Sequence, residues 1–574
     1  MANGLIKGNK LVYSCGCDFN ILQMKPFRAD FDPEMTKIPL SCSTTWDILA
    51  DGNTKGIFQL ETRLGQQSSK RLKPENIEHF AALGALLRPG CLHAKRDGKS
   101  VTDHYFDRKN GLEIVEYFHE CLQDILGTTY GEMTYQEQAM AISTKLAGFS
   151  LQQADNLRKG IGKKKPEIIA AVKIEFLEGC RKVQMVTEAE AEAIFGWIEK
   201  SQRYSFNKSH AVSYAYNGFL SAYAKSHFPT SFFTSYLYYT KDSQKKFDEI
   251  KLLINNAKLM GLDIRPPDFR QLNVHFEKVE TEDVKDVYDE ISQNKVYFGF
   301  ADIKGIGENS TSKILNSVEE IEQALEKTRD SWSWLDFLVY YSDKVSSTVV
   351  EGMVESGALD YFKVPRQKMM FEYQQYSMLN DKEQAWIKQN VKNPKSLTDL
   401  LDKSLSVYPP VILKMKRGFG PCSTKGRVEK IRDIRKLLEK PPYSLADTPE
   451  WLYGVENARL GVSLTASVVD GCKNSSQANM TCLDFLRSKE KNTGIFIAAQ
   501  IDEIKTYIDS KDREMAFMTI SDNDASVDCV AFASVWEEIS NKGICIEDNT
   551  VMVSGERSPR EKDSFIIRNM WQLT

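Results

Sequence analysis

The chain has no long apolar run. None of its 574 residues lies in a stretch that approaches the length of a membrane-spanning helix, and the first residues, MANGLIKGNK, contain no apolar run of signal-peptide length. We therefore expect no membrane association and a cytoplasmic location, in a host cell if the gene is viral.

Paired cysteines are also missing. The eleven cysteines are scattered along the chain, which is typical of free thiols in a reducing compartment. Cys15 and Cys17 could form half of a zinc site, but no second CxC or CxxC pair completes it. The cysteine spacing alone therefore predicts no metal ligands in this chain.

An excess of positive charge is absent as well. The net charge of −4 argues against a histone-like protein, so any nucleic-acid surface must be a local patch. The length suffices for about three or four domains. A hydrophobic content of 42% can fill their cores.

What the chain does have is helical periodicity over most of residues 41–275, with apolar residues three to four positions apart. We expect helices over 74–88, 134–148, 166–182, 187–201, 209–227 and 243–260. Residues 1–40 are rich in turn formers and are expected to be irregular. Residues 278–295 should form a hairpin or loop before a strand at 296–300.

The expected secondary structure changes twice in the C-terminal half. Residues 301–362 should contain short helical hairpins, and 363–493 a helical connector interrupted at Pro409-Pro410 and Pro441-Pro442. Residues 494–574 alternate between apolar and polar side chains, which predicts successive β-strands. The expected fold class is thus mainly α with an all-β C-terminal domain.

The most informative segment is Tyr204–Ala215, YSFNKSHAVSYA. Asn207 or Ser209 can cap the helix that follows, because a short side-chain oxygen satisfies its first amides. The cluster would then lie at a helix N-terminus, where free amides and the positive end of the dipole favour a phosphate. We name as nucleotide-binding candidates Tyr204, Asn207, Lys208, Ser209 and His210.

A second basic cluster, LRKGIGKKKPE, lies upstream and contains Arg158, Lys159 and Lys163. Gly160 and Gly162 would let the backbone of a turn approach a ligand closely. Together the two clusters have what a nucleoside triphosphate site needs: cations for the phosphates, a ring for the base and small polar groups for the sugar. The alternative is that the lysines form a solvated face and that the histidine is simply packed or exposed.

These two segments, in this order, resemble the fingers domain of C-family replicative DNA polymerases, the alpha subunits of bacterial DNA polymerase III. The resemblance continues in blocks that are collinear over most of residues 38–360. They are GIFQLETR (56–63), RLKPENIEHFAALGALLRPGCL (71–92), YGEMTYQEQAM (130–140), LAGFSLQQADNLRKGIGKKK (146–165), YFGFADIKGIGE (297–308) and VESGALD (354–360).

The resemblance implies roles for individual residues. Arg158 and Lys163 would contact the triphosphate. Lys159 stands where the family usually has a second arginine, and lysine keeps the charge but lacks the bidentate fork of arginine. Lys208 would meet a phosphate, and His210 would lie at the sugar edge of the incoming nucleotide. The residues Gln59, Glu61, Arg88, Tyr135, Gln136 and Glu137 are interpreted as scaffold of the fingers.

Two further regions are expected to bind DNA. The segment DIKGIGENSTSKIL fits a helix-hairpin-helix, in which Lys304 and the amides of Gly305 and Gly307 hold a duplex phosphate; an ordinary tight turn is the alternative. The terminal β region resembles the family's oligonucleotide-binding (OB) fold, with Lys505, Lys511 and Arg513 as cationic candidates. Phe517 and Phe532 occupy apolar alternating positions, which favours a place in the barrel core.

A sliding clamp is a conceivable partner. Gln375–Leu379, QYSML, has the general form of a clamp-binding pentapeptide, but it lies in a segment that reads as an amphipathic helix, whereas such peptides must be extended.

Nucleotidyl transfer requires two divalent metals held by carboxylates. In the family these come from a palm domain that precedes the fingers, and only Ala29–Asp32 is similar to its motif; we interpret Asp30 and Asp32 as linker residues. The sequence therefore looks like the downstream part of a split polymerase, with Mg²⁺ supplied through a palm on a second polypeptide, as a virus-type genome with divided genes would explain. It would bind primer-template DNA and deoxynucleoside triphosphates. The alternative is a non-catalytic DNA- or nucleotide-binding remnant with a structural or regulatory role.

From these arguments we expect a palm–fingers linker at 1–40, fingers at 41–275, the end of the fingers with the helix-hairpin-helix at 276–362, a connector at 363–493 and the OB fold at 494–574.

Overall fold

The chain folds as two compact units, Met1–Phe232 with Thr281–Glu290, and Phe233–Glu280 with Ile291–Thr574. A computed structural model describes residues 3–24, 27–30, 32–34, 37–162, 166–201, 204–280, 287–289, 294–391, 394–408, 420–488, 493–559, 561 and 563–573.

The first unit begins with strands β1 (Asn3–Lys7), β2 (Lys10–Tyr13), β3 (Asp18–Met24) and β4 (Phe27–Asp30). With β9 (Val287–Asp289) they form an antiparallel sheet in the order β4-β3-β2-β1-β9. The expectation that residues 1–40 are irregular is therefore wrong. Their turn formers make hairpin turns, as at Gly8, where φ is +62°, and Leu11 and Phe19 are buried in the core.

Helices complete the core of this sheet. Leu49, Phe80, Leu83 and Phe219 are among its buried side chains. The helices are α1 (Ser43–Ala50), α2 (Arg63–Leu72), α3 (Ile77–Leu86), α4 (Pro89–His93), α5 (Val101–Lys109) and α11 (Lys208–His227), with the short strands β5 (Lys95–Arg96) and β6 (Lys99–Ser100) before α5.

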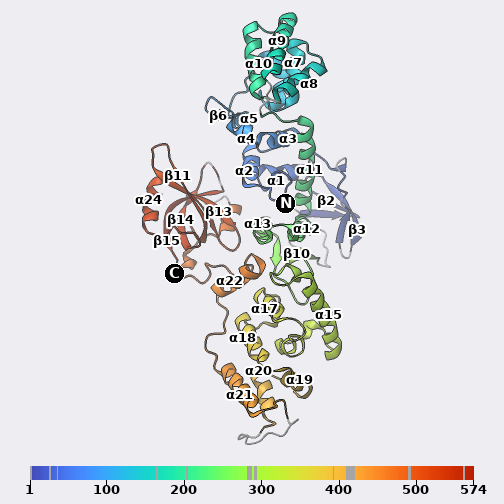
Figure 1. Cartoon of the computed structure of the whole chain (residues 1–574), viewed down its shortest axis with the longest axis vertical. Coiled ribbons are helices and arrows are strands. Elements are labelled where there is room, and N and C mark those ends of the chain that lie inside the picture. The colour runs from blue at the N-terminus through green and yellow to red at the C-terminus, as the bar shows by residue number, and fades with distance from the viewer. Residues whose placement is uncertain are drawn as a thin grey trace. The chain divides into compact units, whose positions relative to one another are not determined.

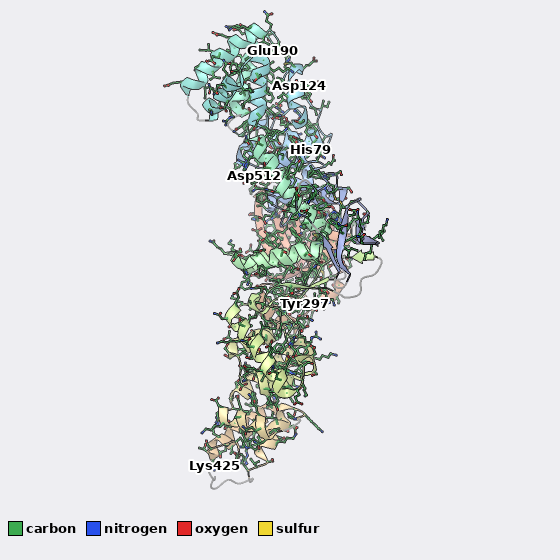
Figure 2. The ribbon with its side chains drawn as sticks, turned by 90° about the vertical axis from the view of Figure 1, so that its right-hand side faces the viewer. His79, Asp124, Glu190, Tyr297, Lys425 and Asp512 are labelled. Atoms are coloured by element: carbon green, nitrogen blue, oxygen red, sulfur yellow. The ribbon has the colours of Figure 1, made fainter. Side chains whose placement is uncertain are left out.

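A second group of helices in this unit has its own core, which includes Leu146, Leu157, Phe176 and Phe195. The group comprises η2 (Glu120–Leu122), α6 (Gln123–Leu126), η3 (Gly127–Thr129), α7 (Gln136–Ala147), α8 (Leu151–Gly162), α9 (Pro166–Val183) and α10 (Glu188–Ser201). Helices α7 to α10 pack together in Figure 1, and Figure 2 labels Asp124 and Glu190 on this group. The helices expected over 134–148, 166–182, 187–201 and 209–227 are present within a few residues.

The second unit begins within α12 (Pro229–Tyr239) and continues with η4 (Thr240–Asp242) and α13 (Lys246–Leu259). Strands β7 (Asp263–Arg265), β10 (Asn294–Tyr297) and β8 (Glu277–Glu280) form a small sheet in that order. The helices that follow bear out short helical hairpins: η5 (Phe300–Asp302), α15 (Glu308–Leu325), η6 (Arg329–Ser331), α16 (Trp334–Asp336), η7 (Phe337–Tyr341), α17 (Ser347–Glu355) and η8 (Asp360–Phe362).

Helices are the regular elements of the described part of 363–493. They are α18 (Arg366–Ser377), α19 (Asp381–Asn390), α20 (Leu397–Leu405), α21 (Lys425–Glu439), α22 (Pro449–Leu460), η9 (Ser475–Gln477) and α23 (Cys482–Arg487). The expected break at Pro409-Pro410 lies outside the described residues.

The C-terminal strands close into a five-stranded barrel in the order β11-β12-β13-β15-β14. They are β11 (Ile495–Ile508), β12 (Glu514–Ser521), β13 (Ser526–Ala531), β14 (Thr550–Arg557) and β15 (Ser564–Gln572), with α24 (Ala533–Asn541) between β13 and β14. The barrel resembles an OB fold, so the expected fold class is confirmed. No helix in the described ranges is both long and apolar enough to span a membrane.

Candidate functional site

Asn207, not Ser209, caps helix α11. Its side chain accepts a hydrogen bond from the amide of His210 at 2.9 Å. The carboxylate of Glu137 accepts bonds from the Asn207 side-chain amide at 2.7 Å and from the Lys208 backbone amide at 2.9 Å. A carboxylate therefore already occupies part of the position that a phosphate would take at this helix end.

Three candidate side chains in the first turn of α11 are at least partly exposed, namely Lys208, Ser209 and His210. His210 is exposed, and its ring is flanked by Phe206 and Tyr214, with centroid distances of 5.3 and 4.0 Å. The Lys208 ammonium lies 3.1 Å from Glu78 and 5.6 Å from the centroid of the Tyr135 ring. The His210 imidazole thus packs against two aromatic rings and remains exposed to solvent, whereas the Lys208 side chain is only partly exposed.

Tyr204 is half-buried and packs directly on Gly90. A Cβ added at Gly90 would lie 2.6 Å from the Cβ of Tyr204, so glycine permits this approach. Burial raises the pKa of Tyr204, which keeps the phenol neutral. Nearby, the Arg88 guanidinium lies 3.5 Å from the centroid of the Phe206 ring.

The first part of the upstream cluster is helical. Gly160 lies inside α8 and not in the expected turn, because the apolar Ala154, Leu157 and Ile161 hold this segment in the helical core. Gly162 is the last residue of α8, and residues 163–165 lie outside the described ranges. Asp155 pairs with both Arg158, at 2.9 Å, and Lys159, at 2.6 Å. Hydrogen bonds from Lys159 and Arg158 lower the pKa of Asp155. Lys163 lies outside the described residues.

Gln136 joins the two clusters. Its side-chain oxygen accepts a hydrogen bond from Arg158 at 3.4 Å, and its side-chain nitrogen donates to the carbonyl of Ser205 at 3.3 Å. The backbone completes the link, because Phe206 bonds to Thr134 at 3.0 Å and Gln136 bonds to Phe206 at 2.9 Å. The fold therefore brings Arg158 to the segment that leads into Asn207 and His210.

Sequence reasoning assigned Gln136 and Glu137 to the scaffold without a specific task. In the structure they are the side chains that connect α8 to the start of α11. The signal available in the sequence was the run of polar residues in YQEQ at the first turn of α7. Consecutive side chains on a helix face different directions and can therefore contact different neighbours.

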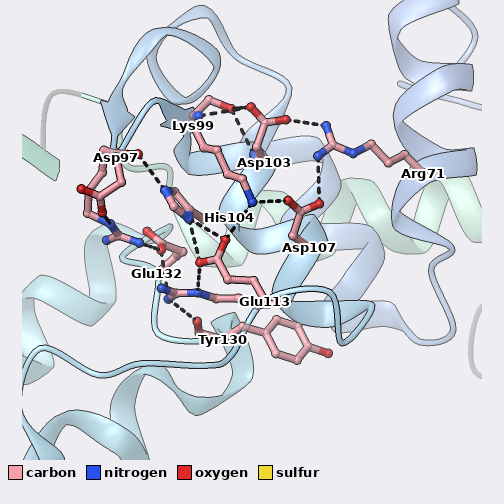
Figure 3. A network of polar contacts seen from close by, with 12 residues as sticks. Arg71, Asp97, Lys99, Asp103, His104, Asp107, Glu113, Tyr130 and Glu132 are labelled. Carbon is pink, nitrogen blue, oxygen red and sulfur yellow. Dashed lines mark hydrogen bonds and ion pairs between the residues drawn. The ribbon is translucent and has the colours of Figure 1, made fainter.

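A partly buried ion-pair network supports the chain just before YQEQ (Figure 3). Glu113 accepts hydrogen bonds from His104 and Arg108, each at 2.8 Å. Burial raises the pKa of Glu113, but the bonds from His104, Arg108 and Lys99 outweigh it and lower the pKa to about 2. Arg108 also donates to the carbonyl of Tyr130 at 3.0 Å. The loop that leads to Tyr135 is thereby fastened to α5.

The helix-hairpin-helix candidates lie on an exposed turn of the second unit. Gly305 has φ of +94°, which favours glycine, and Gly307 is the N-cap of α15. Ile303 and Ile306 anchor the turn in the core. The amides of Gly305 and Gly307 have no acceptor among the described residues, whereas the Lys304 amide bonds to the Arg459 carbonyl at 2.8 Å. This turn presents two free amides and the exposed Lys304 side chain.

The barrel candidates cluster at one hairpin. Lys505, Lys511 and Arg513 are all exposed at the β11–β12 end, whose turn includes Asp512 with φ of +59°. Asp512 is labelled in Figure 2. Lys505 pairs with Glu503 at 2.6 Å, and Arg513 with Asp509 at 2.9 Å.

The prediction that Phe517 and Phe532 belong to the barrel core is wrong: they are 44% and 48% exposed. In β12 the inward positions are Ala516 and Met518, so Phe517 points outward. Its ring meets that of Tyr507, which is 53% exposed, at a centroid distance of 5.3 Å. Aromatic side chains thus accompany the cations on the outer face of this hairpin.

The structure also shows the surroundings of QYSML and of Asp32, one of the two aspartates that we interpreted as linker residues. Gln375 and Tyr376 are buried residues in the last turn of α18, so QYSML is not an accessible extended peptide. The Asp32 carboxylate pairs with Lys37 at 2.5 Å, and the Asp30 side chain lies outside what the structure describes.

Comparison with known proteins supplies an independent line of evidence. Residues 22–184 match the model of the bacterial DNA polymerase III alpha subunit finger domain, and residues 261–369 match that of a helix-hairpin-helix motif. The DNA polymerase III alpha subunit of Aquifex aeolicus is 30% identical over 548 residues, which is 95% of this chain and 40% of that protein.

The alpha subunit of Campylobacter jejuni is 27% identical over 96% of this chain and 42% of its own length, and that of Vibrio cholerae is 34% identical over 58% of this chain and 27% of its own. The chain is thus similar to DNA polymerase III alpha subunits over almost its whole length. It spans about two fifths of the length of the first two of these relatives. The resemblance found in the motifs is thereby confirmed.

Proposed function

We propose that this chain provides the incoming-nucleotide and DNA-binding surfaces of a template-directed DNA polymerase that uses deoxynucleoside triphosphates. The observation that carries the proposal is the junction at Gln136, which brings Arg158 to the capped start of α11. A cation, helix amides and an exposed imidazole then lie on connected segments, and these are groups suited to phosphates and a sugar.

The site needs a conformational adjustment to accept a triphosphate. Asp155 holds Arg158, and Glu137 holds the first amide of α11. We propose that the phosphates replace these carboxylates, since both are acceptors of the same donors. Lys163 is proposed as an additional phosphate contact, and Tyr204 as a neighbour of the nascent base pair.

DNA would be held at two other places. The free amides of Gly305 and Gly307, with Lys304, suit a duplex phosphate without reading sequence. Tyr507 and Phe517, beside Lys505, Lys511 and Arg513, suit a single strand, because bases stack on aromatic rings while cations follow the backbone.

The catalytic metals would be held elsewhere. Two-metal nucleotidyl transfer uses Mg²⁺ bound by clustered carboxylates. Among the described residues the one group with metal-ligand geometry consists of cysteines and a histidine, which do not suit Mg²⁺. We propose that a palm on another polypeptide supplies the Mg²⁺ ligands. The complex would work in the cytoplasm. A sliding clamp, if used, would bind outside QYSML.

Primer extension tests the proposal. The purified chain is assayed with Mg²⁺ and deoxynucleotides, alone and together with a palm-bearing polypeptide from the same genome. Synthesis only in the mixture supports a divided polymerase. Synthesis by the chain alone would refute the separate palm. DNA binding without synthesis in either sample would favour the non-catalytic remnant.

A further inference from the structure

The first unit contains a cluster of four potential metal ligands. The side chains of Cys15, Cys17, Cys42 and His227 each offer one ligand atom, and all four atoms lie within 4.8 Å of one another. Cys17, Cys42 and His227 are at most 5% exposed, and Cys15 is partly exposed. We propose that these residues form a structural zinc site.

The spacing of the donor atoms agrees with a tetrahedral ion. Bonds of about 2.3 Å to sulfur and about 2.0 Å to nitrogen place neighbouring ligand atoms about 3.5–3.8 Å apart. The Nε2 atom of His227 lies 3.4 Å from the sulfur of Cys42 and 3.9 Å from that of Cys15. An ion at the centre would thus require only small side-chain movements.

The ligand types select the metal. Three thiols and one imidazole, without a carboxylate, suit zinc and disfavour magnesium or calcium, which prefer oxygen. Four protein ligands leave no open position for water, which is the pattern of a structural rather than a catalytic zinc.

Turns and helix ends hold the four ligand residues next to one another. Cys15 and Cys17 flank Gly16, whose φ of +88° allows the tight turn between β2 and β3. Cys42 is the N-cap of α1, where the positive end of the helix dipole favours a thiolate. His227 is the last residue of α11.

Aromatic rings surround the imidazole, and the Thr45 hydroxyl donates a hydrogen bond to the Cys42 sulfur at 3.2 Å. The rings of Tyr13 and Tyr223 each lie 4.6 Å from the imidazole, centroid to centroid. His227 Nδ1 has no hydrogen-bond partner in the described ranges. A neutral imidazole with its proton on Nδ1 directs the lone pair of Nε2 at the sulfurs, as a metal ligand would.

Coordination would replace a contact that the cluster already makes. Zinc would take the place of the contact between Cys42 and His227 and release the thiol protons.

The ion would join segments far apart in the sequence. It would tie the β2–β3 turn and the start of α1 to the end of α11, across separations of 212 and 185 residues. The other end of that helix carries Lys208, Ser209 and His210. Spacing rules missed the site because the second pair of ligands is not local: one cysteine and one histidine arrive from separate elements.

Metal analysis of the full chain tests the site. Protein purified without chelator should contain about one zinc per chain. The variants Cys42→Ser and His227→Gln should lose at least about four fifths of it, because three remaining ligands cannot close the tetrahedron. The matched control is Cys91→Ser, a fully buried cysteine of the same unit whose sulfur faces the Ala85 carbonyl, and it should retain the metal.

Cobalt(II) substitution of the unmodified chain avoids dependence on the folding of the variants. Tetrahedral d–d bands together with a sulfur-to-cobalt charge-transfer band are expected. The proposal is overturned if the reduced wild-type chain takes up neither zinc nor cobalt, if cobalt binds without thiolate bands, or if Cys42→Ser and His227→Gln both keep a full zinc complement.

Discussion

At the scale of single residues, Arg158 is the described candidate to which we assign the proposed phosphate contact. It is partly exposed, carries a planar fork of donors, and its present acceptors, Asp155 and Gln136, are side chains that a ligand can replace. Lys159 shares Asp155 but is not bonded to Gln136 in the described structure.

Replacing Arg158 by alanine should therefore impair nucleotide use much more than DNA binding. Charge-assisted hydrogen bonds contribute about 1.5–3 kcal/mol, which corresponds to roughly a ten- to hundredfold rise in KM for deoxynucleotides. Primer extension with the palm-bearing polypeptide measures KM, and fluorescence anisotropy measures duplex affinity. Arg181→Ala, which removes an exposed arginine paired with Glu188, is the control. Equal losses of nucleotide use and duplex binding would count against a triphosphate role.

Glu113 offers a second test at this scale, through pH. Its folded-state pKa of about 2 lies below the ordinary value of 4.5, so its stabilising effect is complete above pH 4.5 and lost as the pH falls toward 2. Glu113→Gln should lower the free energy of unfolding by about 1–3 kcal/mol at neutral pH. Urea titrations at several pH values should show the difference shrinking below pH 4.5. The exposed neighbour Glu116, changed to Gln, should have little effect; a pH-independent difference for Glu113→Gln would contradict the argument.

At the scale of elements, the sequence allowed either Asn207 or Ser209 to start α11, and the structure selects Asn207. Asn207→Ala should lower the free energy of unfolding by about 0.5–2 kcal/mol, because the His210 amide loses its acceptor. Ser209→Ala should leave it nearly unchanged. Thermal or urea unfolding of both variants decides between the two caps, and a larger loss for Ser209→Ala would refute the assignment.

The β11–β12 hairpin can be tested through its exposed ring. Tyr507→Ala should weaken single-stranded DNA binding by about 1–3 kcal/mol while leaving the melting temperature almost unchanged, because the side chain is on the surface. Ile508→Ala, at an adjacent and 63% exposed aliphatic position, is the control and should have a smaller effect. If both substitutions act equally, stacking is not the basis of binding.

The elements also show how far sequence reasoning reaches. Helices with regular apolar spacing, such as 209–227, were predicted within a residue or two because burial of one face decides them. The strands of residues 1–40 were missed because glycine-rich turns hid short alternating segments. Phe517 was misplaced because all of Met515–Met518 is apolar, so alternation alone cannot say which face is inside. The link through Gln136 and the cluster around His227 depend on long-range contacts that no local pattern encodes.

At the scale of the whole molecule, the division into two compact units predicts the unfolding behaviour. Each unit has its own buried core and its own ion pairs. In the first unit the buried Arg108 pairs with the partly exposed Glu113, and in the second the fully buried Glu456 pairs with Arg366. Chains of this kind commonly unfold in more than one step, because the cores need not lose their packing together.

Differential scanning calorimetry should therefore resolve two transitions, and matched substitutions should move them separately. Glu113→Gln should lower only the first unit's transition. Glu456→Gln should lower only the other, because Glu456 is fully buried and accepts bonds from Arg366, Ser463 and Thr465. Breaking a buried pair costs about 3–5 kcal/mol, so the second shift should be the larger. A single transition lowered by both substitutions would mean that the two units unfold as one cooperative body.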